Sequence, residues 1–385
     1  MRRTKILNHC HTILDLRQCA SRRLPAPIFH FLDGAAETEL TAMRNTAAFD
    51  ETPLVPRCLV DVGVVNTAVH VLGQRIEWPV LCSPTGASRL FHPDGELAVA
   101  RAAARAGTLY CLSMGSTHSL EDVAAATEGP KMFQLYVCKN RDITRKLIER
   151  AKRAGYAALC VTVDVPAVGK RERDLRTGFS MPPRLTLRSA LSLARCPGWW
   201  LGQARKGPMM LANFVERAST PGFVAQTKRA TQELDSSVSW KDVREIADLW
   251  KGSLALKGVM SADDARRAAD AGATAVIVSN HGGRQLDGAV APIEVLPEIA
   301  RAVGDRVEVI LDGGIRRGVH VLKALALGAK ACSIGRPYLY GLGAGGEAGV
   351  SRALAILRNE LVLAMKLAGC PDVTCIDQSL IRQSA

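Results

Sequence analysis

Short apolar runs recur along the chain from residue 79 onward, and longer amphipathic stretches separate most of them. Each run has the length and composition of a strand that is buried on both faces. Eight such strands are predicted, at 79–83, 108–112, 132–135, 157–163, 254–256, 275–278, 307–311 and 331–334.

The stretches between these runs carry apolar residues three and four positions apart, which predicts helices. They lie at 95–106, 142–154, 261–271, 292–303 and 318–327. Eight strands that alternate with helices favour an α/β fold, a (β/α)8 TIM barrel. An open, doubly wound parallel sheet is the alternative that this pattern leaves open.

The fourth and fifth predicted strands are separated by about ninety residues, far more than an ordinary crossover needs. We therefore expect a long basic insertion after strand 4, at about 170–235. Residues 1–75 contain a predicted helix at 14–23 and should form an N-terminal helical cap. The chain is interpreted as a single domain in which 76–350 form the barrel and 351–385 a C-terminal helical segment.

The 385 residues are 48% hydrophobic, which is enough for a sizeable core. No apolar run is long enough to cross a membrane, and the N-terminus lacks the apolar core of a signal peptide. We therefore expect a cytoplasmic protein.

The eleven cysteines form no Cys-x-x-Cys pair, and Cys82, Cys111, Cys160 and Cys332 lie in apolar runs. Buried, reduced thiols are expected, with no metal site.

The net charge of +13 is unevenly distributed. Residues 170–230 hold twelve lysines or arginines and three acidic residues. Because this charge is confined to one segment that resembles no nucleic-acid-binding module, nucleic acid is not expected as a partner.

The C-terminal ends of barrel strands are where such folds place their chemistry. Polar residues or glycine-rich turns lie at the ends of all eight predicted strands: Pro84, Thr85, Gly86, Ser113, Gln134, Tyr136, Thr162, Asp164, Lys257, Ser279, His281, Arg284, Asp312, Gly313, Gly314, Gly335 and Arg336.

The most informative of these ends is Ser-Asn-His-Gly-Gly-Arg-Gln-Leu-Asp, residues 279–287. It presents a base, His281, and a guanidinium, Arg284, on a turn whose glycines allow close approach. Such a pair can hold an anion and move a proton beside it. A histidine after a strand is more often a surface or capping residue, but the polar groups at the other strand ends favour a site here.

The last two strand ends predict a phosphate cradle. The turns at 312–316 and 333–337 each combine glycine N–H groups with an arginine, Arg316 or Arg336, at loops where barrels commonly bind phosphate. Lys257, at the fifth strand end, would stabilise negative charge that develops on a cofactor. A structural lysine held in a salt bridge is the alternative.

The run 279–287 occurs together with Phe-Gln-Leu-Tyr at 133–136, Thr-Val-Asp at 162–164, Ile-Arg-Arg-Gly at 315–318 and Ile-Gly-Arg-Pro at 334–337. This set resembles the FMN-dependent L-2-hydroxy-acid oxidase and dehydrogenase family, from about Leu24 to the C-terminus. The resemblance implies FMN as the cofactor, and oxidation of a small 2-hydroxy carboxylate to the 2-oxo acid.

The resemblance also implies roles for individual residues. His281 would be the proton-abstracting base, oriented by Asp164; Arg171 and Arg284 would bind the substrate carboxylate. Tyr136 would bind the substrate hydroxyl or the developing oxyanion. Flavin ring and ribityl contacts would come from Pro84, Thr85, Gly86, Ser113, Gln134, Thr162, Lys257 and Ser279. Phosphate contacts would come from Asp312, Gly313, Gly314, Arg316, Gly335 and Arg336.

Two substrate-binding positions stand out. Phe31 occupies a position where the family usually has a tyrosine, so a hydroxyl that would donate to the carboxylate is missing. This loss should weaken substrate binding without abolishing the chemistry. Gly115 lies where some members carry a tryptophan, and the space predicts lactate or an aromatic acid such as mandelate rather than glycolate.

The segment at about 185–215 combines Trp199 and Trp200 with leucines and with Arg195, Arg205 and Lys206. This composition suits an anionic membrane surface. Members of the family that pass electrons to membrane quinones attach through this loop, so a quinone and the inner face of the cell membrane are predicted partners. Packing on a neighbouring subunit is equally consistent, and the resemblance implies a homo-oligomer, commonly a tetramer.

Three other functions remain open at this point. The first is an oxidase on the same scaffold that passes electrons to oxygen and makes hydrogen peroxide. The second is a flavin-binding protein with a weakened substrate site, of which Phe31 would be the sign. The third is a non-redox phosphate-binding barrel such as an isomerase, which would need neither the arginine pair nor His281 with Asp164.

Overall fold

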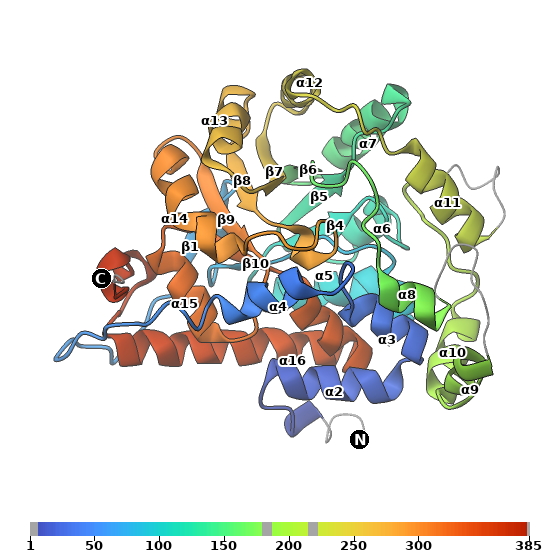
Figure 1. Ribbon diagram of the computed structural model, residues 1–385, viewed down its shortest axis with the longest axis horizontal. Helices are drawn as coiled ribbons and strands as arrows, with labels where there is room; N and C mark the ends of the chain where they lie inside the picture. The colour runs from blue at the N-terminus through green and yellow to red at the C-terminus, as the bar shows by residue number, and fades with distance from the viewer. Residues whose placement is uncertain (1–6, 179–186, 215–221, 383–385) are drawn as a thin grey trace.

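Eight parallel strands close into a barrel in the computed structural model, which describes residues 7–178, 187–214 and 222–382 (Figure 1). The strands are β3 (Val80–Cys82), β4 (Tyr110–Ser113), β5 (Lys131–Leu135), β6 (Ala158–Thr162), β7 (Ser253–Val259), β8 (Ala275–Val278), β9 (Glu308–Asp312) and β10 (Ala331–Ile334). Pairing of β10 with β3 completes the barrel. The predicted TIM barrel is therefore confirmed.

All eight predicted strands are present, and most of their residues are buried. β7 extends three residues beyond its predicted end, because Lys257 and Gly258 interrupt the apolar pattern on which the prediction depended. The barrel interior holds Cys111, Cys160 and several small apolar residues, packed as a separate cluster. Cys82, Cys111, Cys160 and Cys332 are buried free thiols, as predicted.

Helices surround the barrel (Figure 1). They are α5 (Gly95–Arg105), α6 (Leu120–Ala125), α7 (Arg141–Arg153), α12 (Trp240–Trp250), α13 (Ala262–Asp270), α14 (Pro292–Val303), α15 (Gly318–Ala326) and α16 (Arg336–Ala368). In α7, Asn140 caps the first turn, and Thr144, Leu147, Ile148 and Ala151 form the buried stripe. This spacing is the one from which the helix was predicted.

The N-terminal residues contact both ends of the barrel. Helices α3 (Ala26–Asp33) and α4 (Leu40–Ala47) lie at the end where the turn at 279–287 is found, because α4 packs against residues 281–283. Strands β1 (Val69–Val71) and β2 (Gln74–Ile76) form a hairpin whose apolar residues join the barrel-interior cluster. Helix α2 (Ile13–Arg23) packs along α16.

The insertion between β6 and α12 contains α8 (Glu172–Thr177), α9 (Leu187–Ala194), α10 (Pro197–Arg205) and α11 (Phe223–Glu233). These helices lie on one side of the barrel (Figure 1). Three backbone carbonyls of the insertion, at Lys206, Gly207 and Pro208, accept hydrogen bonds from Arg89, which follows β3. The insertion is thus attached to a loop at the C-terminal end of the barrel strands.

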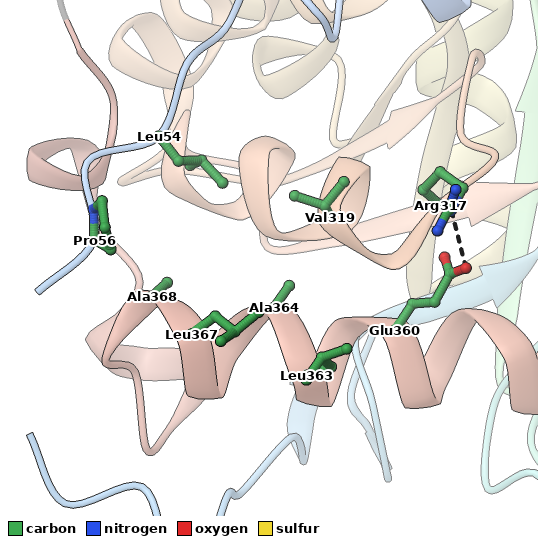
Figure 2. A pocket seen from close by; sticks show the side chains of 9 residues that line it. All are labelled: Leu54, Pro56, Arg317, Val319, Glu360, Leu363, Ala364, Leu367 and Ala368. Atoms are coloured by element: carbon green, nitrogen blue, oxygen red, sulfur yellow. Dashed lines mark hydrogen bonds and ion pairs between the residues drawn. The ribbon is translucent and has the colours of Figure 1, made fainter.

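The last helix, α16, continues from the end of β10 to Ala368 with a kink at Gly345 and Gly346. The boundary that we placed between 350 and 351 therefore falls within a helix. An apolar groove lies between α15, α16 and residues 54–56, and the ion pair of Arg317 with Glu360 lies at one end of it (Figure 2). None of the lining residues is one of the predicted site residues.

Candidate active site

His281 and Asp164 come together at the ends of β8 and β6. The His281 Nδ1 atom lies 3.0 Å from Asp164 Oδ1, and the His281 backbone N–H donates to Ser279 Oγ at 3.1 Å. Burial alone would raise the pKa of Asp164, but the neighbouring His281 and Lys257 lower it. The carboxylate therefore stays ionised and can orient the imidazole and stabilise its protonated form.

The turn that carries His281 has a strained backbone. His281 has a φ of +58°, a conformation that costs a non-glycine residue roughly 1–3 kcal/mol. Asn280 stabilises the turn: its Oδ1 accepts from the Gly283 N–H at 3.1 Å and from Asn45 Nδ2 at 2.8 Å. Asn45 on α4 was not predicted, because no local pattern pairs it with a residue 235 positions away.

Two arginines lie close to the Phe31 ring. The Arg284 guanidinium lies 5.2 Å from the ring centre and that of Arg171 lies 5.7 Å from it. Burial, together with the charges of Arg171 and Arg336, lowers the pKa of Arg284. Clustered positive charge of this kind favours a bound anion. The structure thus brings the two predicted carboxylate ligands together.

Arg284 and Arg171 are held differently. Arg284 Nη1 donates to the carbonyl oxygens of Phe31 at 2.9 Å and Gly34 at 2.8 Å. Arg171 Nε donates to Asp174 Oδ2 at 2.8 Å, in an ion pair that sequence reasoning did not predict. The other Asp174 carboxylate oxygen is buried and has no hydrogen-bond partner among the described residues.

Tyr136 follows β5 and presents its hydroxyl to the same region. Burial raises the pKa of this hydroxyl, and the nearby charge of Asp164 adds to the effect. Tyr136 is therefore a neutral hydrogen-bond donor at physiological pH, as a group that binds a hydroxyl or an oxyanion should be.

The side chains predicted to surround a flavin leave several buried polar atoms without a partner. Gln134 Nε2, Thr162 Oγ1 and Arg336 Nε have none among the described residues, although Ser113 Oγ donates to Gln134 Oε1 at 3.0 Å. Buried polar atoms are rarely left unpaired in native proteins. Their position at three strand ends indicates a polar cofactor above the barrel.

Lys257 and Asp312 form a buried ion pair inside the barrel mouth. Lys257 Nζ lies 2.9 Å from Asp312 Oδ2 and donates to Ser279 Oγ at 2.9 Å. Burial alone would raise the pKa of Asp312, but Lys257, Ser83 and Ser279 lower it. The Asp312 carboxylate is thus paired with Lys257, and a role of Asp312 in binding phosphate stays a prediction.

The glycine-rich ends of β9 and β10 have the backbone geometry of a cradle. Gly313 and Gly314 have φ angles of +122° and +76°, and a Cβ at Gly314 would overlap the Asn45 carbonyl oxygen. Arg316 donates to the Ile315 carbonyl oxygen at 2.8 Å, and burial lowers its pKa. Gly335 is the N-cap of α16, so a helix N-terminus faces the same region.

The loops after β3 and β4 contact each other. The Ala87 N–H donates to the Gly115 carbonyl oxygen at 2.9 Å, and a Cβ at Gly86 would come within 3.2 Å of that oxygen. Thr85 Oγ1 lies 2.7 Å from the Tyr338 hydroxyl. A Cβ at Gly115 would meet Ser113 Oγ at 3.7 Å and the Gly86 Cα at 3.9 Å, which are ordinary van der Waals contacts.

Residues Ser83 and Glu96 support this part of the site, and sequence reasoning missed both. Ser83 Oγ donates to Asp312 and contacts Ser333 Oγ at 2.5 Å. Glu96, which is fully buried, accepts from the backbone N–H groups of Ser88 and Thr117, both at 2.9 Å. The loops after β3 and β4 are thereby joined.

A parallel barrel whose strand ends carry a histidine–carboxylate pair, an anion site and a glycine-rich cradle is a cofactor-dependent barrel enzyme. The chain matches the FMN-dependent dehydrogenase family over residues 20–383. It is 43% identical to the L-lactate oxidase of Nostoc sp., over 96% of this chain and 97% of that protein. It is also 43% identical to a putative L-lactate dehydrogenase of Mycobacterium tuberculosis, over 95% of this chain and 87% of that protein.

Solved structures of similar proteins support the same family assignment. The crystal structure of the monotopic membrane protein (S)-mandelate dehydrogenase is similar with a TM-score of 0.94 and 38% identity, covering 98% of this chain and 100% of that one. The chain therefore belongs to the FMN-dependent dehydrogenase family. The predicted family and the predicted cofactor, FMN, are confirmed. The unpaired atoms of Gln134, Thr162 and Arg336 and the cradle at Gly313 and Gly314 fit such a cofactor.

Proposed function

We propose that the protein oxidises an L-2-hydroxy acid to the 2-oxo acid. The observation that carries this proposal is that Arg171 and Arg284 approach one ring, and that Arg284 ends the turn on which His281 pairs with Asp164. A carboxylate held by two guanidiniums has a fixed orientation, which brings its α-carbon within reach of a base. A non-redox isomerase would not need this arrangement.

Each residue then has a defined task. Arg171 and Arg284 bind the carboxylate and exclude other orientations. His281 removes a proton from the substrate, and Asp164 stabilises the imidazolium that forms. Tyr136 donates a hydrogen bond to the substrate oxygen. FMN would be held by Gln134, Thr162, Lys257 and the cradle of β9 and β10, and would supply the acceptor for the two electrons and the hydroxyl proton that leave the substrate.

The space at Gly115 supports a substrate with a side chain larger than hydrogen. L-lactate and L-mandelate are the preferred candidates, and both correspond to substrates named for relatives of this chain. Glycolate, which has only hydrogen at this position, leaves the space unfilled. We therefore expect glycolate to bind more weakly, by roughly 0.8 kcal/mol for each methylene-sized group that it lacks.

The insertion supports attachment to a membrane surface. Leu191, Trp200 and Leu201 on α9 and α10 are 51%, 46% and 43% exposed. Trp199 points inward and donates to the Leu90 carbonyl oxygen at 2.7 Å, so one tryptophan of the pair faces outward. No helix in the described parts of the chain is long and apolar enough to span a membrane. We propose peripheral attachment through these three side chains, with a membrane quinone as the electron acceptor.

Anaerobic flavin reduction tests the proposed activity. The purified FMN-loaded protein should lose its yellow colour with L-lactate or L-mandelate and react more slowly with glycolate. Reoxidation with a quinone and with oxygen then separates a dehydrogenase from the oxidase alternative. A flavin that none of these acids reduces would refute the proposal and favour a weakened substrate site.

Sedimentation with anionic vesicles at low salt tests the attachment. The triple variant Leu191→Gln, Trp200→Gln, Leu201→Gln should stay in the supernatant, whereas Leu363→Gln, Leu367→Gln, which alters exposed leucines beside the groove of Figure 2, should still sediment. If the triple variant sediments as fully as the control variant, the result would instead support packing of the insertion on a neighbouring subunit. Point substitutions are preferable to deletion, because Asn213 in the same segment binds Ser116 Oγ at 2.7 Å.

A further inference from the structure

Arg173 is a charged residue of the insertion that is two positions from the proposed substrate ligand Arg171. It belongs to α8, the short helix that begins directly after Arg171. Its Nη1 donates to Asp33 Oδ2 at 2.9 Å and its Nη2 donates to Glu39 Oε2. One guanidinium thus joins the insertion to two carboxylates of the N-terminal segment.

We propose that Arg173 is a positioning residue for the substrate carboxylate site. By holding α8 against the turn at 33–39, it sets the position of Arg171 relative to Phe31 and Arg284. This inference rests on the proposed function, since it assumes that the substrate carboxylate lies between Arg171 and Arg284.

The turn at 33–39 also holds the other substrate arginine. The Gly34 carbonyl oxygen accepts from Arg284 Nη1 and from Arg336 Nη2, both at 2.8 Å. The Ala36 N–H donates to the Gly283 carbonyl oxygen at 2.9 Å. Arg173 therefore attaches α8 to the same turn that orients Arg284, so both arginines share one support.

Asp33 is a rigid anchor for this contact. Its carboxylate is buried and also accepts from Arg17 Nε at 2.5 Å and from the Tyr340 hydroxyl at 2.7 Å. Burial alone would raise the pKa of Asp33, but Arg17, Tyr340 and Arg173 hold it well below its usual range. Asp33 is therefore ionised, and Arg17 and Tyr340 hold it in addition to Arg173.

The other ion pairs of α8 are local. Arg176 pairs with Glu172 on the same helix, and Arg171 pairs with Asp174. Neither pair joins the helix to the N-terminal segment. Arg176 also offers a matched control, because its side chain is 77% exposed and carries the same charge on the same helix.

Steady-state kinetics of the FMN-loaded, full-length variants Arg173→Ala and Arg176→Ala test the proposal. Arg173→Ala should raise KM for the best 2-hydroxy acid, and the inhibition constant of its 2-oxo acid product, by roughly tenfold, because misplaced binding groups lose affinity. Its kcat should stay within about twofold of wild type, since His281 and Asp164 are untouched. Arg176→Ala should leave both constants unchanged.

Equal KM values for the two variants would overturn the proposal, as would a lowered kcat at unchanged KM. If Arg173→Ala does not fold, Arg173→Lys tests the proposal instead. Lysine keeps the positive charge but lacks the guanidinium group, whose two nitrogens bind two carboxylates at once. A raised KM at an unchanged melting temperature supports the proposal, and an unchanged KM refutes it. Failure of the proposed function is separate: it would show as no flavin reduction in the wild-type protein.

Discussion

The imidazole of His281 and the carboxylate of Asp164 lie 3.0 Å apart, although 117 positions separate them in the chain. Strands β6 and β8 end at the same face of the barrel, and β7 lies between them. The pair therefore depends on barrel closure rather than on any local motif. Its histidine is partly exposed, and Arg284 lies three residues further along the same turn.

Replacement of Asp164 by asparagine should lower kcat by about 10²–10⁴-fold, because the amide cannot stabilise the imidazolium as a carboxylate does. FMN content should not change, since Asp164 contacts His281 and not the cradle. Steady-state assays together with the absorbance ratio of flavin to protein check both points. A kcat within threefold of wild type would count against this role of Asp164.

Restoring the missing hydroxyl with Phe31→Tyr should lower KM for the best substrate. One added hydrogen bond contributes about 0.5–1.5 kcal/mol, which corresponds to roughly two- to tenfold in KM. Phe29→Tyr is a suitable control, because the Phe29 ring lies near Arg17 rather than near Arg171 or Arg284. A KM that stays the same or rises in Phe31→Tyr would show that Phe31 is not at the carboxylate site.

His320 predicts a loss of stability in mild acid. Burial, together with the charge of Lys323, lowers its pKa from the ordinary 6.5 to about 4, and its ring stacks on Phe49 at 4.3 Å. Because the folded-state pKa is the lower one, protons bind the unfolded chain first as the pH falls below about 6.5. The resulting loss of stability stops growing only near pH 4.

From pH 7 to pH 5 this single group should remove about 2 kcal/mol from the free energy of unfolding. Urea denaturation of wild type and His320→Leu at both pH values measures the contribution. The variant should be less stable at pH 7 yet lose about 2 kcal/mol less than wild type on acidification. Parallel losses in the two proteins would disprove the assignment.

Much of the fold could be predicted from the sequence, because parallel strands buried on both faces are continuous apolar runs. The eight strand positions were predicted for this reason. The β1–β2 hairpin was not, since Val69, Val71 and Ile76 sit in short stretches without a strong period. Nor could the pattern show that α3 and α4 would contact the catalytic loops.

Candidate site residues could be proposed where a residue type carries its chemistry within a motif, as with His281 and Arg284. They could not be proposed where the role depends on a distant partner. Asp312 follows a strand and precedes two glycines, as a phosphate loop would, yet pairs with Lys257 across the barrel. The attachment of Arg173 to Asp33 likewise joins segments that no local pattern connects.

The central claim is that His281 removes the proton from a 2-hydroxy acid held by Arg171 and Arg284. Anaerobic single-turnover reduction of the bound flavin in wild type and His281→Gln tests this most directly, because it excludes the acceptor from the measurement. We expect the variant to keep its FMN and to be reduced at least about 10³ times more slowly at saturating substrate. Reduction of the His281→Gln flavin at the wild-type rate would contradict the account.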